Sequence, residues 1–350
     1  MTPTSTLNTF GFLPYVKPVG MTSRDLVNRV QRRLRREMNC RKLKVGHTGT
    51  LDPLADGLVV IAVGSGARLT PWMLQHAKRY LARFELGVSS ISGDLEEPTT
   101  PLVGAPQPST AEIQRAVQDL HGWIDQTPPA HSAIWVDGKR AHERARLGED
   151  IEMPTRRVWI DSIELVSYEY PHLVIDVRCG SGTYLRSLGM DIARRCGSVA
   201  VMTGLTRTEV GPFHIQAAVA EVPPNDPPPE NLEQLSQGLT PMGDFTELRT
   251  RICSPMSGLG HMPCLTLSAE DRQRVCTGLP VTGVPKQPPE ADLAMTGFRA
   301  ESITKPFGEH GQTNAPPEEC IAVDAEGRLV GVLRMKLGQW APYRVFQSPD

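Results

Sequence analysis

The residue with the clearest capacity for chemistry is Asp52, which lies in the stretch VGHTGTLDPLADGLVVIAVGSG at residues 45–66. Glycine, threonine and proline surround this carboxylate, and an apolar segment follows it. A carboxylate that a neighbouring cation keeps ionised and aimed can act as a nucleophile. Asp before Pro is also a frequent turn former, whose side chain bonds nearby backbone N–H groups. The residues alone leave both interpretations open.

A second stretch with possible chemistry is VIDVRCGSGTYLRSL at residues 174–188, whose pattern indicates a strand, a glycine turn and a helix. Small residues at such a turn let backbone N–H groups approach a phosphate or a nucleotide. The pattern partly resembles the glycine loop of S-adenosylmethionine-dependent methyltransferases, although Arg178 stands where the first glycine of that loop belongs. Tyr184 and Arg186 follow directly. Their ring and guanidinium suit a nucleobase and an anionic partner, respectively.

Basic residues concentrate between Val30 and Lys44, where seven Lys or Arg stand against a single Glu. The formal net charge of the whole chain is only −2, so the distribution of charge is more informative than its sum. A basic strip of this kind is typical of phosphate-binding surfaces, and a solvated helix face has the same pattern. Nucleic acid is therefore one of two open interpretations of this strip.

Two helices are expected near these groups. The segment GMTSRDLVNRVQRRL predicts a helix with Ser23 as its N-cap and an apolar face formed by Leu26, Val30 and Leu34. A second helix is expected from Tyr184, with Gly197 at its end and an apolar face formed by Leu185, Leu188 and Ile192. Alternating patterns predict strands at residues 79–86, 158–166 and 173–178.

Composition places the chain among globular proteins. Its 350 residues, 39% of them hydrophobic, can form one large domain and a smaller one. The longest apolar run, residues 58–63, is much shorter than a membrane span, and no secretory signal is visible, so we expect a cytoplasmic protein. The seven cysteines contain no C-x-x-C pair and are expected to be free thiols. No familiar zinc spacing fits Cys253, His261, Cys264 and Cys276.

A proline-rich segment, VPPNDPPPENL, divides the chain. We expect a first domain at residues 1–221, a linker at 222–244 and a small strand-rich module at 245–350. Within that module, Gly327 of DAEGR is expected in the turn of a hairpin. Residues 283–318 are rich in Pro, Gly and polar residues, which predicts a flexible loop.

The stretch GHTGTLDPLADGLVVIAVGSGARLT resembles the central motif of the TruB family of tRNA pseudouridine synthases, which convert one uridine of the TΨC loop (position 55) to pseudouridine. Three further motifs of that family have counterparts in the same order: its Lys-Pro motif in VKPVGMTSRDLVNRVQRR, its tyrosine strand in AKRYLARFELG, and its Gly-Thr-Tyr-x-Arg motif in VRCGSGTYLRSLGMDIA. TPPAHSAIWVDGKRAHERARLGE and LTRTEVGPF also match family segments. The resemblance covers about residues 11–215.

This resemblance implies catalytic roles for three residues. Asp52 would be the nucleophile and would attack either the sugar C1′ or the base C6. Tyr80 would stack on the flipped uracil and take the C5 proton at the end. Arg186 would pair with Asp52 and so hold the carboxylate ionised and aimed.

The resemblance also implies residues that bind the substrate. Tyr184 and Leu205 would line the uracil pocket, and His47 would fill the gap that the extruded base leaves in the RNA loop. A histidine satisfied within its own loop is the alternative for His47. An insertion at about residues 125–156 would grip the tRNA arm through Lys139, Arg140, Arg144 and Arg146.

The fold implied by the resemblance is an α+β pseudouridine synthase fold with a mixed, mainly antiparallel central sheet. The C-terminal block is loosely similar to a β-rich, PUA-like RNA-binding module. No cofactor, metal, membrane or protein partner is implied, and the expected protein is a monomer that binds the TΨC arm of tRNA. The chain departs from the family at Val16, at His142 and in SSISGD, where the approach to the Gly-Asp pair after Tyr80 lacks the usual threonines.

Two alternatives stay open at this point. One is an RNA-binding or tRNA-folding protein on the same scaffold, which does not depend on catalysis. The other is the S-adenosylmethionine-dependent methyltransferase suggested by the glycine turn, which would bind that cofactor.

Overall fold

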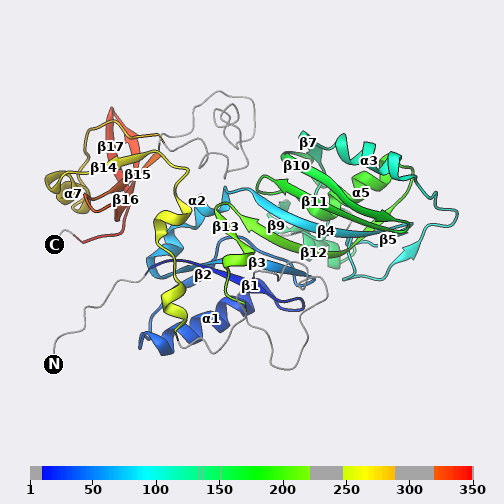
Figure 1. Cartoon of the computed structure of the whole chain (residues 1–350), viewed down its shortest axis with the longest axis horizontal. Helices are drawn as coiled ribbons and strands as arrows, with labels where there is room; N and C mark the ends of the chain where they lie inside the picture. The colour runs from blue at the N-terminus through cyan, green and yellow to red at the C-terminus, as the bar shows by residue number, and fades with distance from the viewer. Residues whose placement is uncertain are drawn as a thin grey trace.

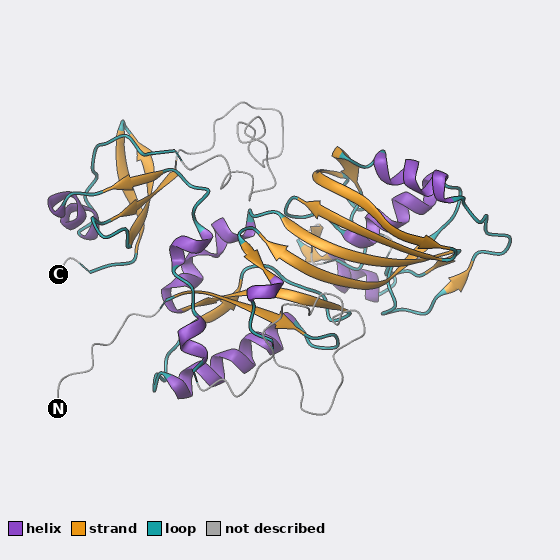
Figure 2. Ribbon diagram, viewed as in Figure 1, coloured by secondary structure: helices purple, strands orange, loops and turns teal. Residues whose placement is uncertain are grey.

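The structure, a computed structural model, describes residues 10–132, 134–136, 138–149, 151–220, 247–287 and 319–348. A large unit built on one extended sheet lies beside a smaller β unit formed by the C-terminal residues (Figures 1 and 2). The expected linker at 222–244 lies outside the described residues, as does most of the expected loop at 283–318. None of the described helices is both long and apolar enough to cross a membrane.

The large unit is organised around a nine-stranded sheet, whose pairings within the described residues are antiparallel except for that between β3 and β12. The main path has the order β1 (Gly11–Lys17), β3 (Ala55–Val63), β12 (Ala200–Val210), β4 (Lys78–Leu86), β11 (His172–Cys179), β10 (Arg156–Glu169) and β7 (Gly122–Gln126). Off this path, β2 (Val45–His47) pairs with β3 and β13 (Phe213–His214) with β12.

This topology confirms the mixed, mainly antiparallel sheet and the three expected strands, which lie in β4, β10 and β11. It contradicts the methyltransferase interpretation, because that fold needs a series of parallel strands joined by helices. Instead, the glycine turn at residues 180–182 connects β11 to a single helix. Every residue of β3 is buried, which explains its nearly continuous apolar sequence.

The described helices are α1 (Ser23–Glu37), α2 (Thr70–Leu74), α3 (Thr110–Gln118), α4 (Ala141–Arg146), α5 (Leu185–Arg195) and α7 (Ala269–Cys276). The buried faces of α1 and α5 contain the residues expected from their spacing. The expected N-cap of α1 was wrong. Thr22 caps this helix and forms a capping box with Asp25, while the neighbouring Ser23 is buried in the first turn.

Helices α3 and α5 pack against each other and cover one face of the sheet at β4, β10 and β12. Contact between α5 and β4 is close because Gly189 lies over Phe84: a Cβ at this glycine would stand 2.1 Å from the ring atom Cε1. Gly197 ends the α5 segment with φ +70°, as expected. The sheet therefore holds the first turn of α5 in a fixed position.

The C-terminal unit contains a four-stranded sheet in the order β14 (Cys264–Thr266), β15 (Glu319–Val323), β16 (Leu329–Lys336) and β17 (Gln339–Val345). Gly327, with φ +74°, lies in the turn between β15 and β16, which confirms the expected hairpin. One apolar cluster continues from the large unit into this sheet and includes Phe12, Trp72, Ile321, Leu329 and Val332. The Trp72 indole also donates to Glu319 at 2.7 Å, so the two units share a packed interface.

Smaller elements complete the description. The short strands are β5 (Val88–Ser89), β6 (Thr100–Pro101), β8 (Trp135–Val136) and β9 (Lys139–Arg140), and the 3-10 turns are η1 (Gly64–Leu69), η2 (Ile215–Ala217), η3 (Leu248–Arg251) and η4 (Pro255–Gly258). The edge of β1 that does not pair with β3 is covered by residues from late in the sequence. Phe12 and Cys253 exchange two backbone hydrogen bonds, and Val16 donates to the Val219 carbonyl. All seven cysteines are free thiols, as expected.

Candidate active site

A cavity of about 540 Å³ opens where the loop after β2, strands β4 and β12, and the turn before α5 meet. Five of the six residues expected in the site line it, namely Asp52, Tyr80, Tyr184, Arg186 and Leu205. They come from four segments that are far apart in the sequence. His47 is not part of this lining.

The loop that carries Asp52 is fixed through its backbone. The Ser23 hydroxyl of α1 donates to the Leu51 carbonyl and accepts from the Leu51 N–H, both at 2.9 Å. Gly20 donates to the Pro53 carbonyl at 2.7 Å. The Asp52 side chain itself is 45% exposed, so a rigid loop presents an open carboxylate.

Arg207 on β12 also holds the loop that carries Asp52. This side chain is only 2% exposed. Its guanidinium donates to the carbonyls of Leu58 at 2.6 Å, Thr50 at 3.1 Å and Gly49 at 3.1 Å. Three carbonyl acceptors satisfy a buried cation that would otherwise be costly. Sequence reasoning missed this role, and the only signal was an arginine within an otherwise buried strand.

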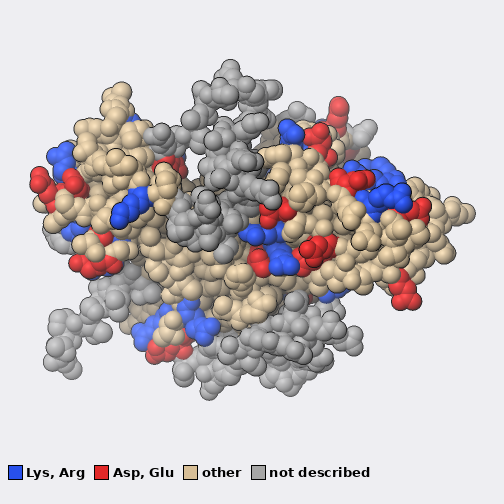
Figure 3. Space-filling view, turned by 45° about the horizontal axis from the view of Figure 1, so that its top comes forward, with Lys and Arg blue, Asp and Glu red and all other residues tan. Residues whose placement is uncertain are grey.

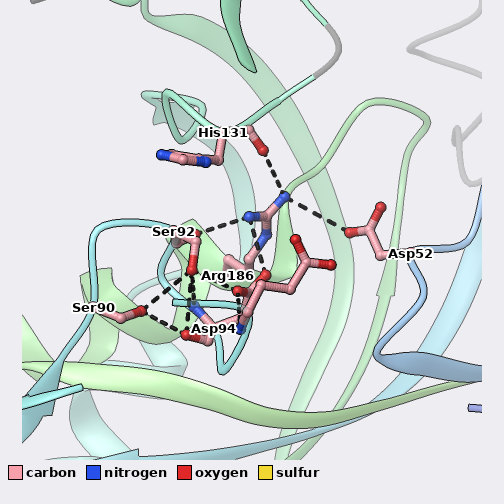
Figure 4. A network of polar contacts seen from close by, with 7 residues as sticks. Asp52, Ser90, Ser92, Asp94, His131 and Arg186 are labelled. Atoms are coloured by element: carbon pink, nitrogen blue, oxygen red, sulfur yellow. Dashed lines mark hydrogen bonds and ion pairs between the residues drawn. The ribbon is translucent and has the colours of Figure 1, made fainter. Parts of the chain in front are cut away.

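Arg186 lies between two carboxylates (Figure 4). Its Nη1 donates to the Ser92 carbonyl at 2.8 Å and is 3.1 Å from Oδ2 of Asp94. Its Nη2 donates to the His131 carbonyl at 3.1 Å and is 3.7 Å from Oδ2 of Asp52. The expected contact between Arg186 and Asp52 is thus present, as the longer of the two contacts that Arg186 makes with a carboxylate. The buried Asp94 makes the shorter one and holds the guanidinium in place.

Asp94 is itself held by its own loop. Its Oδ1 accepts from the Ser92 hydroxyl at 2.6 Å and from the Glu96 N–H at 3.0 Å. The preceding Gly93 has φ +76°, and a Cβ there would meet Met190 of α5 at 3.2 Å. Glycine at this position therefore lets the loop approach α5 closely enough for Asp94 to reach Arg186. The Gly-Asp pair was visible in the sequence, but no role had been inferred for it.

Tyr80 and Lys78 belong to β4 and point into the same cavity. Burial raises the pKa of the Tyr80 hydroxyl, and a hydrogen bond with Arg207 acts in the opposite direction. Burial also lowers the pKa of Lys78 to about 7. The Lys78 ammonium donates to the carbonyls of Leu74 at 2.7 Å and His76 at 2.6 Å, so it fixes the turn that leads into β4.

Tyr184 occupies the N-cap position of α5. The buried Gln126 side chain accepts from the Tyr184 N–H at 2.8 Å and donates to its carbonyl at 3.1 Å. The Arg156 guanidinium lies 4.8 Å from the centre of the Tyr184 ring and donates to the Gly182 carbonyl. Leu205, 8% exposed, contributes an apolar wall. An aromatic ring, a cation and an apolar wall together suit a planar base.

His47 lies at the end of β2, where its Nδ1 accepts from the Gly49 N–H at 3.4 Å. Burial lowers the pKa of this imidazole below its ordinary value. The structure thus places His47 beside the loop that carries Asp52, two residues before Gly49 of the cavity lining, and its expected role in the RNA stays a prediction.

The basic residues expected to contact RNA lie on exposed surfaces. Arg24, Arg29, Arg32 and Arg36 are on the outer face of α1. In the insertion, the Arg140 guanidinium is 4.6 Å from the centre of the Trp135 ring, and Arg144 pairs with Glu149 at 2.6 Å. The side chains of His142 and Arg146 are outside the described residues. On the face in Figure 3, basic side chains form small clusters with acidic ones beside them. In the part of the chain that the structure describes, no group of three His, Cys, Asp or Glu could hold a metal ion.

Comparison with known proteins adds an independent finding. The model of the TruB family pseudouridylate synthase N-terminal domain matches residues 35–185. The tRNA pseudouridine synthase B of Rhodopirellula baltica is 49% identical, with 100% of this chain and 98% of that protein covered. The protein of the same name from Brucella canis is 34% identical, with 86% and 93% covered.

Solved structures agree in fold. A chain of a Cbf5-Nop10-Gar1 complex has a TM-score of 0.66 at 21% identity, covering 98% of this chain and 86% of that one. A chain of an H/ACA RNP bound to a substrate RNA containing 2'-deoxyuridine has a TM-score of 0.63 at 19% identity, covering 98% and 87%. The fold is that of the pseudouridine synthases. On sequence, the chain belongs to the TruB family of pseudouridylate synthases.

Proposed function

We propose that this protein isomerises one uridine in the TΨC loop of tRNA, at position 55, to pseudouridine, with Asp52 as the nucleophile. The observation that carries the proposal is the meeting of Asp52, Tyr80 and Arg186 in one cavity, where a rigid loop presents an open carboxylate. Relatives named tRNA pseudouridine synthase B support tRNA as the substrate and the cytoplasm as the place of action.

The cavity suggests how the reaction proceeds. The target uridine leaves the RNA stack and enters the cavity, where Tyr184 and Leu205 contact the base. The Asp52 carboxylate attacks C1′ or C6, the bond between N1 and C1′ breaks, and the uracil turns so that C5 bonds to C1′. The bond between Asp52 and C1′ or C6 then breaks with its electron pair returning to the carboxylate, so that Asp52 is regenerated. Tyr80 then takes the proton from C5, and N1 gains one, so that the product is an isomer of the substrate.

Arg186 has a positioning role in this scheme. Its guanidinium is anchored by Asp94 and two carbonyls, which leaves Nη2 directed at Asp52 from 3.7 Å. At that distance the guanidinium attracts the carboxylate without a close ion pair that would quench the nucleophile. The carboxylate therefore stays free to attack while its orientation is restricted.

RNA binding is assigned to surfaces around the cavity. The outer face of α1 and the insertion at about residues 125–156 supply cations for backbone phosphates. The C-terminal sheet, which we propose to be a PUA-like RNA-binding module, is packed against the large unit.

The test uses an unmodified tRNA transcript labelled with tritium at uridine C5. We expect the wild-type protein to release tritium from a single TΨC-loop uridine and Asp52→Asn to release none while binding the transcript as tightly as wild type. Asp191→Asn, a change on α5 at an ion pair with the exposed Arg194, serves as the matched control and should retain activity. A wild-type protein that binds the transcript without releasing tritium would replace this proposal by the tRNA-folding alternative.

A further inference from the structure

An exposed apolar side chain stands at the mouth of the cavity. Leu74, the last residue of α2, lines the cavity and is 41% exposed. It lies against the loop that carries Asp52, since a Cβ at Gly49 would be 4.0 Å from Cδ2 of Leu74. The N–H of the same Gly49 donates to Nδ1 of His47 at 3.4 Å. Leu74 and His47 thus flank one point of the catalytic loop.

The backbone that presents Leu74 is held firmly. Lys78, only 6% exposed, donates to the Leu74 carbonyl at 2.7 Å and to the His76 carbonyl at 2.6 Å. The His76 ring bonds the Gly258 carbonyl at 2.9 Å and packs edge-on against His261, with ring centres 4.5 Å apart. The turn that ends α2 is therefore fixed from two sides, and Leu74 is fixed with it.

We propose that Leu74 packs against the nucleobase next to the target uridine and helps to keep the target out of the stack. The inference rests on the proposed function. When the target base occupies the cavity, the sugar-phosphate backbone keeps its two neighbouring nucleotides close to the opening, where Leu74 is exposed. Apolar side chains that enter a base step disfavour restacking and shield the unstacked face from water.

Single exposed apolar residues are common on protein surfaces and usually have no role. Val103 is such a residue: it is 97% exposed and does not line the cavity. Leu74 differs from Val103 because it adjoins the candidate nucleophile's loop and a buried cation holds its backbone. This contrast gives the experiment its matched control.

The experiment compares wild type, Leu74→Ala, Leu74→Met and Val103→Ala. Single-turnover tritium release is measured with a TΨC stem-loop, and 2-aminopurine placed beside the target uridine reports unstacking in a parallel series that also carries Asp52→Asn. We expect Leu74→Ala to lower the efficiency of release by roughly five- to tenfold, as suits the loss of one apolar contact. The 2-aminopurine signal should fall with it. Leu74→Met should restore both readouts, and Val103→Ala should change neither.

The outcomes separate this inference from the proposed function. If wild type is active and Leu74→Ala matches Val103→Ala in both readouts, Leu74 does not contact the RNA and the inference is wrong. If Leu74→Ala is slow but unstacks the neighbour normally, or if Leu74→Met fails to rescue it, the side chain acts on the protein and the inference is again wrong. If wild type releases no tritium, the proposed function fails and takes this inference with it.

Discussion

Asp94→Asn is the substitution that tests the polar network most directly, because it removes one charge and almost no volume. At an effective dielectric constant of about 20, two unit charges 3.1 Å apart attract by about 5 kcal/mol, which is the situation of Arg186 and the buried Asp94. Asp52 is half-exposed and 3.7 Å away, so a dielectric constant nearer that of water, about 80, applies to its attraction, which is then about 1 kcal/mol. The buried carboxylate therefore decides where the guanidinium lies.

Loss of one member of a buried ion pair costs about 3–5 kcal/mol, because the remaining charge stays buried. The asparagine NH2 would also face the Arg186 Nη1 donor. We expect the melting temperature of Asp94→Asn to fall by roughly 6–15 °C. The guanidinium should shift toward Asp52 and misplace the nucleophile, which would slow single-turnover tritium release by roughly a hundredfold.

Both quantities are measured on the same preparations, by thermal unfolding and by single-turnover tritium release. Asp191→Asn is the matched control, since it removes a carboxylate on α5 that is 17% exposed at its side chain and pairs with Arg194, which is 73% exposed. An ion pair with such an exposed partner is well screened and contributes about 0–1 kcal/mol, so this control should melt and react nearly like wild type. An Asp94→Asn protein that behaves like Asp191→Asn in both assays would refute the argument that Asp94 positions Arg186.

Three further predictions concern other parts of the fold. Arg207→Met should remove the donor from the carbonyls of Leu58, Thr50 and Gly49, of which Leu58 is buried, lower the free energy of unfolding in urea by about 2 kcal/mol, and reduce the single-turnover rate more than tRNA affinity. A Gly→Ala change in an exposed helix would add about 1 kcal/mol of stability. Gly189→Ala should instead destabilise the protein by at least about 2 kcal/mol, because the new Cβ would overlap the Phe84 ring. A gain in urea resistance would contradict this. Burial lowers the pKa of His261 from 6.5 to about 3, so below pH 6.5 the unfolded chain binds more protons than the folded one. The contribution of His261 to the free energy of unfolding is therefore full above pH 6.5 and should fall by roughly 2 kcal/mol by pH 5. Melting curves of His261→Phe should show a weaker pH dependence.

Local patterns predicted the buried faces of α1 and α5 well and the start of α1 less well. The apolar spacing of Leu26, Val30 and Leu34 fixes the buried face of α1 whatever the rest of the fold does. The N-cap was assigned one residue too late, because Thr22 and Ser23 both have hydroxyl side chains that suit a cap. Asp25, three residues after Thr22, completes the capping box and decides between them.

The site was predictable only where a motif supplied it. Asp52 and Arg186 were paired through a family resemblance, since a separation of more than a hundred residues gives no physical reason for them to meet. Asp94 and Arg207 were missed because their importance comes from burial, and a charged side chain on a half-buried strand or loop is expected to face water. Only the folded structure shows that Arg207 of β12 lies beside the loop that carries Asp52, through its hydrogen bonds to Thr50 and Gly49.

The closure of the β1 edge by Cys253 has a consequence for synthesis on the ribosome. Phe12 emerges about 240 residues before its backbone partner, an interval on the order of ten to fifty seconds at ordinary elongation rates. During that time the nascent chain can pair β1 with β3, and Val219 can cover the opposite edge at Pro14 and Val16, but the part of that edge at Phe12 stays available to any other strand. Growing chains on one polysome should therefore be most prone to aggregate before Cys253 emerges, and a chaperone that covers this edge would raise the yield of native protein.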